Sequence, residues 1–326
     1  MAKSGNIILL ITHSGDFFTI DRVAEAISKQ GARPFRFDTD KFPLEVQLKA
    51  QFDKSKSSHR LEYDSYSINT EEVQAVWMRR IWEPDLGQEL DPQFQEACLR
   101  ESQATLSGFW DSLRDAHWVD DLERIKAAGN KQRQLRVASE VGLIIPQTLI
   151  TNNPEEAREF FQQVKGKMVA KLLTALSHSM DYTSFFLYTS AVKEEDLADA
   201  GSLRYCPMVF QEEIPKQLEL RVVFVEGNLF VGALDASVYR ESKVDWRKPG
   251  IEVGAWQHHE MPDEIVAQIK ALMAKLGLLF GALDFILTPS GEYVFLEVNP
   301  VGEWGMLERD LELPISKAIA EALISQ

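Results

Sequence analysis

The spacing of apolar residues predicts helices and strands along most of the chain. The run 6–12 is almost entirely apolar and ends in a polar turn, as expected of a buried strand. Ile20, Val23 and Ile27 then recur at helical spacing. The run 46–52 alternates apolar with polar residues, which is typical of an antiparallel strand. Together these patterns predict an α/β (α+β) fold that contains antiparallel ribbons as well as helix-covered strands.

Capping residues predict the limits of two further helices. Asp91 precedes a proline and a long helical pattern that extends to about Leu113. Asn153 begins another helix, which stops at Gly166, because glycine commonly follows a helix C-terminus. The first α/β unit is expected to end near residue 118, before the helix that begins the second unit.

A predicted hairpin near the C-terminus carries polar residues in an apolar setting. Asp284 lies within the apolar run 279–287, and the returning run ends with Glu297 and Asn299. Side chains two apart on a strand share a face, so Glu297 and Asn299 point the same way and Asp284 can face them. Two carboxylates and an amide oxygen suit Mg²⁺, which leaves coordination positions for phosphate. The alternative is an isolated buried Asp beside a polar strand end, but burying carboxylates without a cation is costly, so we predict a nucleotide's metal site.

Three other strand positions are candidates for binding an anion or a base. Lys171 lies in the apolar run 168–173, where a lysine needs an anion, although a lysine that reaches solvent from an edge strand is the alternative. Residues 211–214 end a strand and enter a linker, where exposed backbone can bond the edge of a base. Glu219 and Arg221 share one face of the next strand, and a cross-strand ion pair is the alternative there.

Composition limits the class of partner. The 326 residues carry a formal net charge of −15, which argues against a surface that follows nucleic-acid phosphates and leaves room for a basic or cationic peptide partner. Two cysteines are too few for a disulfide framework or a zinc site, so we expect a cytoplasmic protein. The first apolar run is too short to span a membrane and lacks a signal-peptide cleavage region, so we expect no membrane association.

In this order along the chain, the strand lysine, the strand end at 211–214, the Glu-x-Arg strand and the carboxylate hairpin resemble the ATP-grasp ligase superfamily. The resemblance covers essentially the whole chain. It implies an ATP-grasp fold with an N-terminal pre-ATP-grasp domain at 1–118. A central domain with a lid hairpin and a peptide-binding helix would occupy 119–207, and a C-terminal ATP-grasp domain with the metal site would occupy 208–326.

The resemblance also implies a role for each matching residue. Lys131 and Lys171 would reach the phosphates of ATP, and Arg221 would face an acyl phosphate. Glu219 would hold the ribose. The magnesium ion would be held by Asp284, Glu297 and Asn299. The adenine would be held by the strand end, that is by Gln211, Glu212, Glu213 and Ile214. One departure from the family concerns the loop 174–182, which lacks the glycines that many members place over the phosphates.

Three segments, 36–43, 76–80 and 297–303, look like the macrocyclases of microviridin biosynthesis. These enzymes join side chains within a ribosomal precursor peptide, either as ω-esters of Thr or Ser or as an ω-amide of Lys. The segments 12–18 and 302–308 are more similar to the amide-forming type. The resemblance therefore implies a ligase that uses ATP to activate a Glu or Asp side chain of the peptide and closes a lactam with Lys.

Several alternatives stay open. An ester-forming macrocyclase shares the same motifs, and so does a ligase that adds free amino acids to a peptide or protein. A non-catalytic binding module is a third alternative, but the intact Lys171 and Asp284 speak against it. The sequence does not identify the precursor, the ring size or the oligomeric state, and a homodimer is compatible with it.

Two more groups of charged residues are candidates for contacting the peptide. Arg79 and Arg80 are candidate catalytic residues with Lys171 and Arg221, because a guanidinium matches a substrate carboxylate, and structural salt bridges are the alternative. In the family, the region of the acidic stretch 193–199 grips an arginine of the helical leader. The carboxylates that would do so here are Glu195, Asp196 and Asp199, and a solvated helix face is the alternative.

Overall fold

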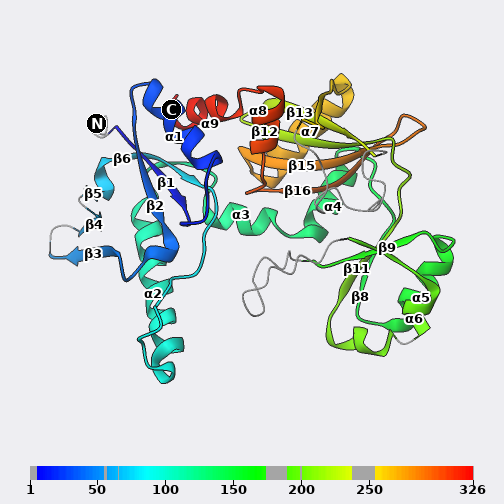
Figure 1. Ribbon diagram of the computed structural model, residues 1–326, viewed down its shortest axis with the longest axis horizontal. Coiled ribbons are helices and arrows are strands. Elements are labelled where there is room, and N and C mark those ends of the chain that lie inside the picture. Colours follow the sequence, from blue (N-terminus) through cyan, green and yellow to red (C-terminus); the bar gives the residue numbers. More distant parts are fainter. Residues whose placement is uncertain are drawn as a thin grey trace.

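The structure, a computed structural model, describes residues 6–54, 57–64, 66–173, 189–198, 200–236 and 254–325. Its strands form three units, which Figure 1 shows as an N-terminal unit on the left, a large sheet at the upper right and a smaller central unit at the lower right. The large sheet and the central unit meet where the candidate site residues gather. The predicted loop 174–182 lies outside the described residues.

A parallel sheet forms the middle of the N-terminal unit. Its strands, in spatial order, are β2 (Arg33–Asp38), β1 (Ile7–Thr12), β6 (Val73–Met78) and β7 (His117–Val119). All of β1 is buried because its alternate residues meet helices on opposite faces. Ile8 and Leu10 pack with α1 (Thr19–Lys29), and Leu9 and Ile11 pack with α2 (Pro92–Ser112).

The predicted helix limits and the antiparallel ribbon of this unit are confirmed. The carboxylate of Asp91 accepts a hydrogen bond from the N–H of Gln93, and Gly31 after α1 has a φ of 84°, which favours glycine. The ribbon comprises three strands and lies next to two single-turn 3₁₀ helices. These elements are β3 (Val46–Phe52), β4 (Ser57–Tyr63), β5 (Tyr66–Asn69), η1 (Thr39–Lys41) and η2 (Thr70–Glu72).

The large sheet is antiparallel throughout. Its spatial order is β14 (Gln257–His258), β13 (Asn228–Asp235), β12 (Leu218–Val225), β15 (Phe280–Leu287) and β16 (Tyr293–Asn299). Helix α7 (Asp263–Leu276) covers one face and ends at Gly277, which has a φ of 76°. Helices α8 (Gly305–Leu311) and α9 (Ile315–Ile324) cover part of the other face.

One apolar core joins the N-terminal unit to the large sheet. Ile20 of α1, Val223 of β12 and Ile319 of α9 belong to the same buried cluster, and α9 packs against α1. Helix α9 contacts both β6 and β12, so the two sheets pack against the same helix. The residue that follows β6, Arg79, is thereby close enough to bond with the loop that follows β16. This core holds the N-terminal unit beside the candidate site.

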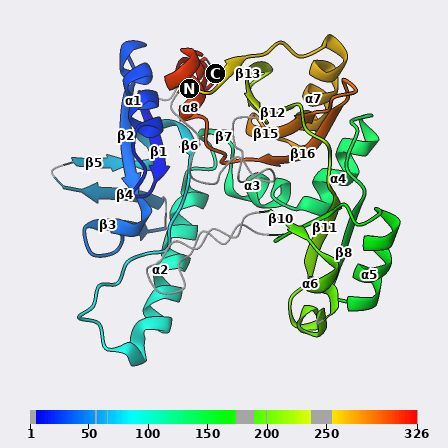
Figure 2. The ribbon, with the colours of Figure 1, turned by 45° about the vertical axis from the view of Figure 1, so that its right-hand side comes forward.

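The central unit has a sheet and an apolar core of its own. The strands, in spatial order, are β10 (Ser190–Val192), β9 (Met168–Lys171), β11 (Met208–Glu212) and β8 (Thr148–Thr151). The helices are α5 (Pro154–Gln163), α6 (Glu194–Ala198) and η3 (Ala200–Tyr205). In Figure 2 this unit again lies below the large sheet, as it does in Figure 1.

The predicted domain limits stay predictions, but two elements bear on them. Strand β11, which we assigned to the C-terminal domain, pairs with β8 and β9 of the central sheet. Residues of α3 (Leu122–Ala128) and α4 (Lys131–Glu140), which we assigned to the central domain, are buried in the core beneath the large sheet. The chain passes from α4 under the large sheet to β8 of the central sheet, and later from β11 of the central sheet to β12 of the large sheet. Each crossing lies a few residues from a predicted domain limit or within a predicted domain.

A buried carboxylate ties the N-terminal sheet to the large sheet. Asp120 follows β7 and is 2% exposed, and its two oxygens accept the N–H groups of Leu279 and Phe280 at 3.0–3.1 Å. Burial raises the pKa of Asp120 to about 6, although the backbone hydrogen bonds act in the opposite direction.

Asp120→Asn should therefore change how stability depends on pH. Between about pH 4 and about pH 6 the folded protein keeps a proton that the unfolded chain has released, so wild-type stability falls as the pH rises, by up to about 3 kcal/mol. We expect the Tm of the wild type minus that of the variant to be smaller at neutral pH than at mildly acidic pH, measured by circular dichroism. A difference independent of pH would contradict this assignment.

Candidate active site

A row of three charged residues crosses the large sheet. Arg221 on β12 is opposite Asp284 on β15, and Asp284 is opposite Glu297 on β16. Residues directly opposite one another in an antiparallel sheet point to the same face, so the three side chains form one row. Nη1 of Arg221 donates to Oδ1 of Asp284 at 2.7 Å, and Lys131 places its Nζ 2.6 Å from Oε2 of Glu297.

The row lies where an apolar sheet face becomes polar. Val223 and Val225 share a face with Arg221, and they are buried in the core with α9, whereas Arg221 and Glu219 lie further along β12, toward the central unit. The opposite face of β12 packs in the core with α7 and is apolar. Helices α8 and α9 therefore cover the apolar end of this sheet face, and the charged residues lie at the end that these helices do not cover.

A β-bulge in β16 brings Glu297 onto this face. Asp284 pairs with Glu297 and the next residue, Phe285, pairs with Phe295, so Leu296 is the extra residue. Phe295 can thus enter the core with Phe285, and Glu297 still faces the site, although the two are only two residues apart. Asn299 lies opposite Ala282, which confirms that Glu297 and Asn299 share the face of Asp284.

A cavity between the large sheet and the central unit brings most of the predicted nucleotide and metal residues together. They come from β9, the end of β11, β12, β15 and β16. The members that line it are Lys171, Gln211, Glu212, Glu213, Ile214, Glu219, Asp284 and Glu297. Apolar side chains, among them Val169 and Ile286, line it as well, so it offers both apolar surface and charged groups.

Side-chain hydrogen bonds hold the strand end at 211–214 in place. Nε2 of Gln211 donates to Oγ1 of Thr148 at 2.9 Å, and Gln211 is 3% exposed. The carboxylate of Glu212 accepts hydrogen bonds from the N–H and Nε2 of Gln147 at 3.0 and 2.9 Å. Both side chains thus bind the start of β8, and this fixes the backbone of β11 where it enters the cavity.

The two predicted phosphate lysines lie differently, and a third lysine was missed by sequence reasoning. Lys171 ends β9 and lines the cavity. Lys131 begins α4, whose N-terminus is capped by the side chain of Asn130; it is not among the lining residues but contacts Glu297, which is. Lys216 also lines the cavity and pairs with the carboxylate of Glu219. Its position in the linker after the strand end at 211–214 was the only signal for it in the sequence.

The oxygen donors at this edge of the sheet fit a magnesium ion bound to phosphate. Asp284 and Glu297 line the cavity and supply carboxylate oxygens. Asn299 is not among the lining residues but shares their sheet face, and its amide oxygen accepts the N–H of Val301 at 3.1 Å. Such hard oxygen donors suit Mg²⁺, which needs few protein ligands. Among the described residues no group of three or more His, Cys, Asp or Glu is placed to hold a metal, so a site made only of such residues was not found there.

Comparison with known proteins identifies the family. Residues 7–126 match the model of the MvdD pre-ATP-grasp domain. The macrocyclase MdnB from Microcystis aeruginosa MRC is 65% identical, with a TM-score of 0.84 over 98% of this chain and 99% of that one. The chain belongs to the ATP-grasp macrocyclases. This confirms the family and the fold class that the sequence motifs implied.

Two further solved structures resemble the chain over nearly its full length. MdnC from the same organism, bound with precursor peptide MdnA, is 37% identical, with a TM-score of 0.87 over 98% of this chain and 100% of that one. A Chryseobacterium gregarium RiPP-associated ATP-grasp ligase, in complex with ADP and a leader and core peptide, is 36% identical, with a TM-score of 0.92 over 98% and 97%. A search of the curated proteins found no match.

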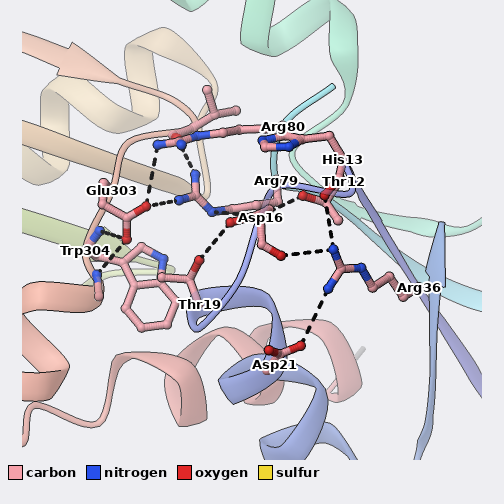
Figure 3. A network of polar contacts seen from close by, with 12 residues as sticks. Thr12, His13, Asp16, Thr19, Asp21, Arg36, Arg79, Arg80, Glu303 and Trp304 are labelled. Atoms are coloured by element: carbon pink, nitrogen blue, oxygen red, sulfur yellow. Dashed lines mark hydrogen bonds and ion pairs between the residues drawn. The ribbon is translucent and has the colours of Figure 1, made fainter. Parts of the chain in front are cut away.

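In this macrocyclase, Arg79 and Arg80 have different surroundings (Figure 3). Arg79 is fully buried and donates to Oε2 of Glu303 and to the carbonyl oxygen of Val301, both at 2.5 Å. Burial lowers the pKa of Arg79 to about 10. A fully buried side chain cannot touch a substrate carboxylate without rearrangement, so the structure favours the salt-bridge alternative for Arg79. The side chain of Arg80 is 38% exposed and lies 3.5 Å from the same oxygen of Glu303, so it can still meet a substrate.

Glu303 lies within the motif segment 297–303, but no role was assigned to it from the sequence, so it is a second candidate that sequence reasoning missed. Burial acts to raise its pKa, but Arg79, Arg80 and the N–H groups of Trp304 and Gly305 outweigh it, and the pKa of Glu303 lies below its ordinary value. The residue therefore remains charged and joins the N-terminal unit to the start of α8.

The acidic helix of the predicted leader site is only five residues long. Asp196 accepts the backbone N–H of Lys193 at 2.8 Å, so its carboxylate caps the helix to which it belongs. Glu195 is exposed and lies 3.0 Å from Nζ of Lys193, and Asp199 lies outside the described residues.

None of the described helices is both long and apolar enough to cross a membrane.

Gly302→Ala should disturb the macrocyclase site from within. A Cβ at this position would lie 2.4 Å from Cβ of Ala282 on β15 and 3.1 Å from Nη2 of Arg221, so the loop after β16 would have to move. We expect the free energy of unfolding to fall by about 1–3 kcal/mol, as in other overpacked sites.

Gly108→Ala provides the matched control, because nothing lies within 4 Å of the added Cβ in the middle of α2. It should raise stability by about 0.5–1 kcal/mol, since alanine favours a helix over glycine. Denaturant unfolding of both variants checks the pair, and equal stabilities would show that the loop does not lie as tightly on β15 as described.

Proposed function

We propose that this macrocyclase uses Mg·ATP to join a Glu or Asp side chain of a ribosomal precursor peptide to a Lys side chain as an ω-amide. The observation that carries the proposal is the row of Arg221, Asp284 and Glu297 at the edge of a cavity lined by Lys171 and the strand end at 211–214. Cations, hard oxygen donors and an apolar wall meet there, as binding of a nucleoside triphosphate requires.

Each part of the cavity suits a part of the nucleotide. The backbone at 211–214 would bond the adenine edge, and Glu219 the ribose. Lys131 and Lys171 would bind the phosphates. Asp284, Glu297 and Asn299 would hold a magnesium ion, whose charge offsets the charge that collects on the phosphoryl oxygens.

The reaction then has two steps. An oxygen of the peptide carboxylate bonds to the γ-phosphorus as the bond to the bridging oxygen of ADP breaks, which gives an acyl phosphate. The lysine ammonium first loses one proton to a nearby base or to water, and the neutral amine bonds to the acyl carbon. The bond from that carbon to the phosphate oxygen breaks, and the second proton of the amine leaves with the phosphate. Arg221 would bind the acyl phosphate, and Arg80 would guide the peptide carboxylate toward it.

The amide-forming type is supported by the segments 12–18 and 302–308. The peptide partner is supported by MdnC, which was solved with a precursor peptide, and by the Chryseobacterium gregarium ligase, which was solved with a leader and a core peptide. We propose that the helix around Glu195 and Asp196, with Asp199, contacts an arginine of the leader. Since Asp196 also caps this helix, Glu195 is the better position for testing that contact by charge reversal.

Mass spectrometry of a candidate precursor, incubated with the enzyme and Mg·ATP, tests the bond type. Each ring removes one water. We expect a lysine-to-arginine change in the peptide to prevent the lactam, a change of its Thr or Ser residues to have no such effect, and the product to resist mild alkali. A ring that requires Thr or Ser, or opens in mild alkali, would move the enzyme to the ester-forming type.

Glu297→Gln tests the metal assignment with little change in shape. It removes one of the two carboxylates in the row, so we expect Mg-dependent ring formation to fall by roughly 100-fold or more, the scale of losing a preorganised charged group. Glu292→Gln, an exposed position in the turn of the same hairpin, is the control and should keep wild-type turnover. Normal turnover by Glu297→Gln across a magnesium titration would sink the assignment.

A further inference from the structure

Arg221, which would bind the acyl phosphate, is held from two sides. It donates through Nη1 to Asp284 at 2.7 Å, and through Nε and Nη2 to a single carbonyl oxygen, that of Glu303, at 3.1 and 2.8 Å. Two donors on one acceptor fix the plane of the guanidinium as well as its distance. The aim of Arg221 thus depends on where the loop after β16 holds one main-chain carbonyl.

That loop has little freedom on the side of β15. The N–H of Gly302 donates to the carbonyl of Asn299 at 3.1 Å, and the missing Cβ of Gly302 is what allows the loop to lie against Ala282. On this side the loop is tied to the predicted metal hairpin. Its outer side faces the N-terminal unit.

Arg79 holds the outer side of the loop. One nitrogen of its guanidinium binds the carbonyl of Val301, and another binds the carboxylate of Glu303, so the two contacts lie on either side of Gly302. The N–H of Arg79 donates to the carbonyl of Ile11 at 2.9 Å, which anchors the residue to β1. A fully buried guanidinium is costly and can often be replaced by apolar residues without loss of stability, so stability alone does not account for it.

We propose that Arg79 is a positioning residue that sets the orientation of Arg221 through the loop 301–303. Resting on the proposed function, this inference gives the N-terminal unit a part in the chemistry although Arg79 does not line the nucleotide cavity. Arg79 holds the loop next to the N-terminal sheet through its contacts with Val301 and Glu303. The position of the loop fixes the carbonyl oxygen of Glu303. That oxygen accepts two hydrogen bonds from Arg221 and so orients it beside Asp284. A shift of about 1 Å in such a chain is enough to slow a reaction by about 100-fold.

A double-mutant cycle with Arg79→Gln and Arg221→Lys tests the proposal in full-length protein. We expect Arg79→Gln alone to lower kcat about 100-fold with little change in the KM for ATP. In the Arg221→Lys background, the same change should cost less than about threefold, because the residue through which it acts is already altered. Arg79→Lys keeps a positive charge opposite the carboxylate of Glu303, so its kcat should lie between those of the wild type and Arg79→Gln.

Arg36→Gln is the matched control. Arg36 belongs to the same polar network and binds the carbonyls of His13 and Asp16, both in the N-terminal unit (Figure 3). Whatever it costs, it should cost the same factor in both backgrounds. Equal losses from Arg79→Gln in both backgrounds would reduce Arg79 to a merely structural residue and overturn the proposal.

A crystal structure of the Arg79→Gln variant separates this inference from the proposed function. We expect the carbonyl of Glu303 to leave Arg221 while the pair of Arg221 with Asp284 persists. Unchanged contacts at Glu303 would overturn the inference even if the enzyme closes rings. If the wild type closes no ring with any precursor, the proposed function fails, whereas displacement of the carbonyl would still support the role of Arg79 in orienting Arg221.

Discussion

The ion pair between Arg221 and Asp284 is the interaction on which the site depends. Both side chains are nearly buried on a sheet face whose continuation is apolar, so neither charge can be left without the other. The carbonyl of Glu303 accepts a hydrogen bond from Arg221 on one side of the pair. On the other side, the second carboxylate, that of Glu297, lies opposite Asp284. Lys131 compensates that second carboxylate from a different helix.

The arrangement of the three units follows from this need for partners. Helix α9 merges the cores of the N-terminal unit and the large sheet, which brings the end of β6 to the loop after β16. The central unit has a separate core and meets the large sheet across the cavity, where β11 leads into β12 through a short linker. We infer that the two boundaries differ in kind: one is a continuous apolar core, and the other is a cavity, lined by both charged and apolar side chains, in which a nucleotide would bind.

Local patterns in the sequence were enough to predict most elements and much of the site. Apolar runs identified β1 and the carboxylate hairpin, helical spacing identified α1, and a capping residue identified α2. The order of the motifs predicted that Lys171, Glu219 and Asp284 lie together. Strict alternation does not predict the bulge at Leu296, because a bulge depends on how the partner strand packs. The contact of Arg79 with Glu303 joins residues 224 positions apart, and no local periodicity reports such a contact.

The overall charge of this enzyme is strongly negative, whereas the charges close to Arg221 are mixed. With a formal net charge of −15, the protein attracts a cationic peptide over distances comparable to the Debye length, about 8 Å at physiological salt. Near Arg221, three arginines (79, 80 and 221) face the carboxylates of Glu303 and Asp284, with Glu297 next in the row and Asp16 3.9 Å from Nε of Arg79. In the proposed reaction an acceptor lysine arrives as an ammonium ion, which the acidic surface favours. An arginine close to the amine lowers the amine's pKa and so favours the neutral form, and a close carboxylate has the opposite effect. The arginines that suit an anionic acyl phosphate would therefore also favour the reactive amine only where it lies nearer to them than to the carboxylates.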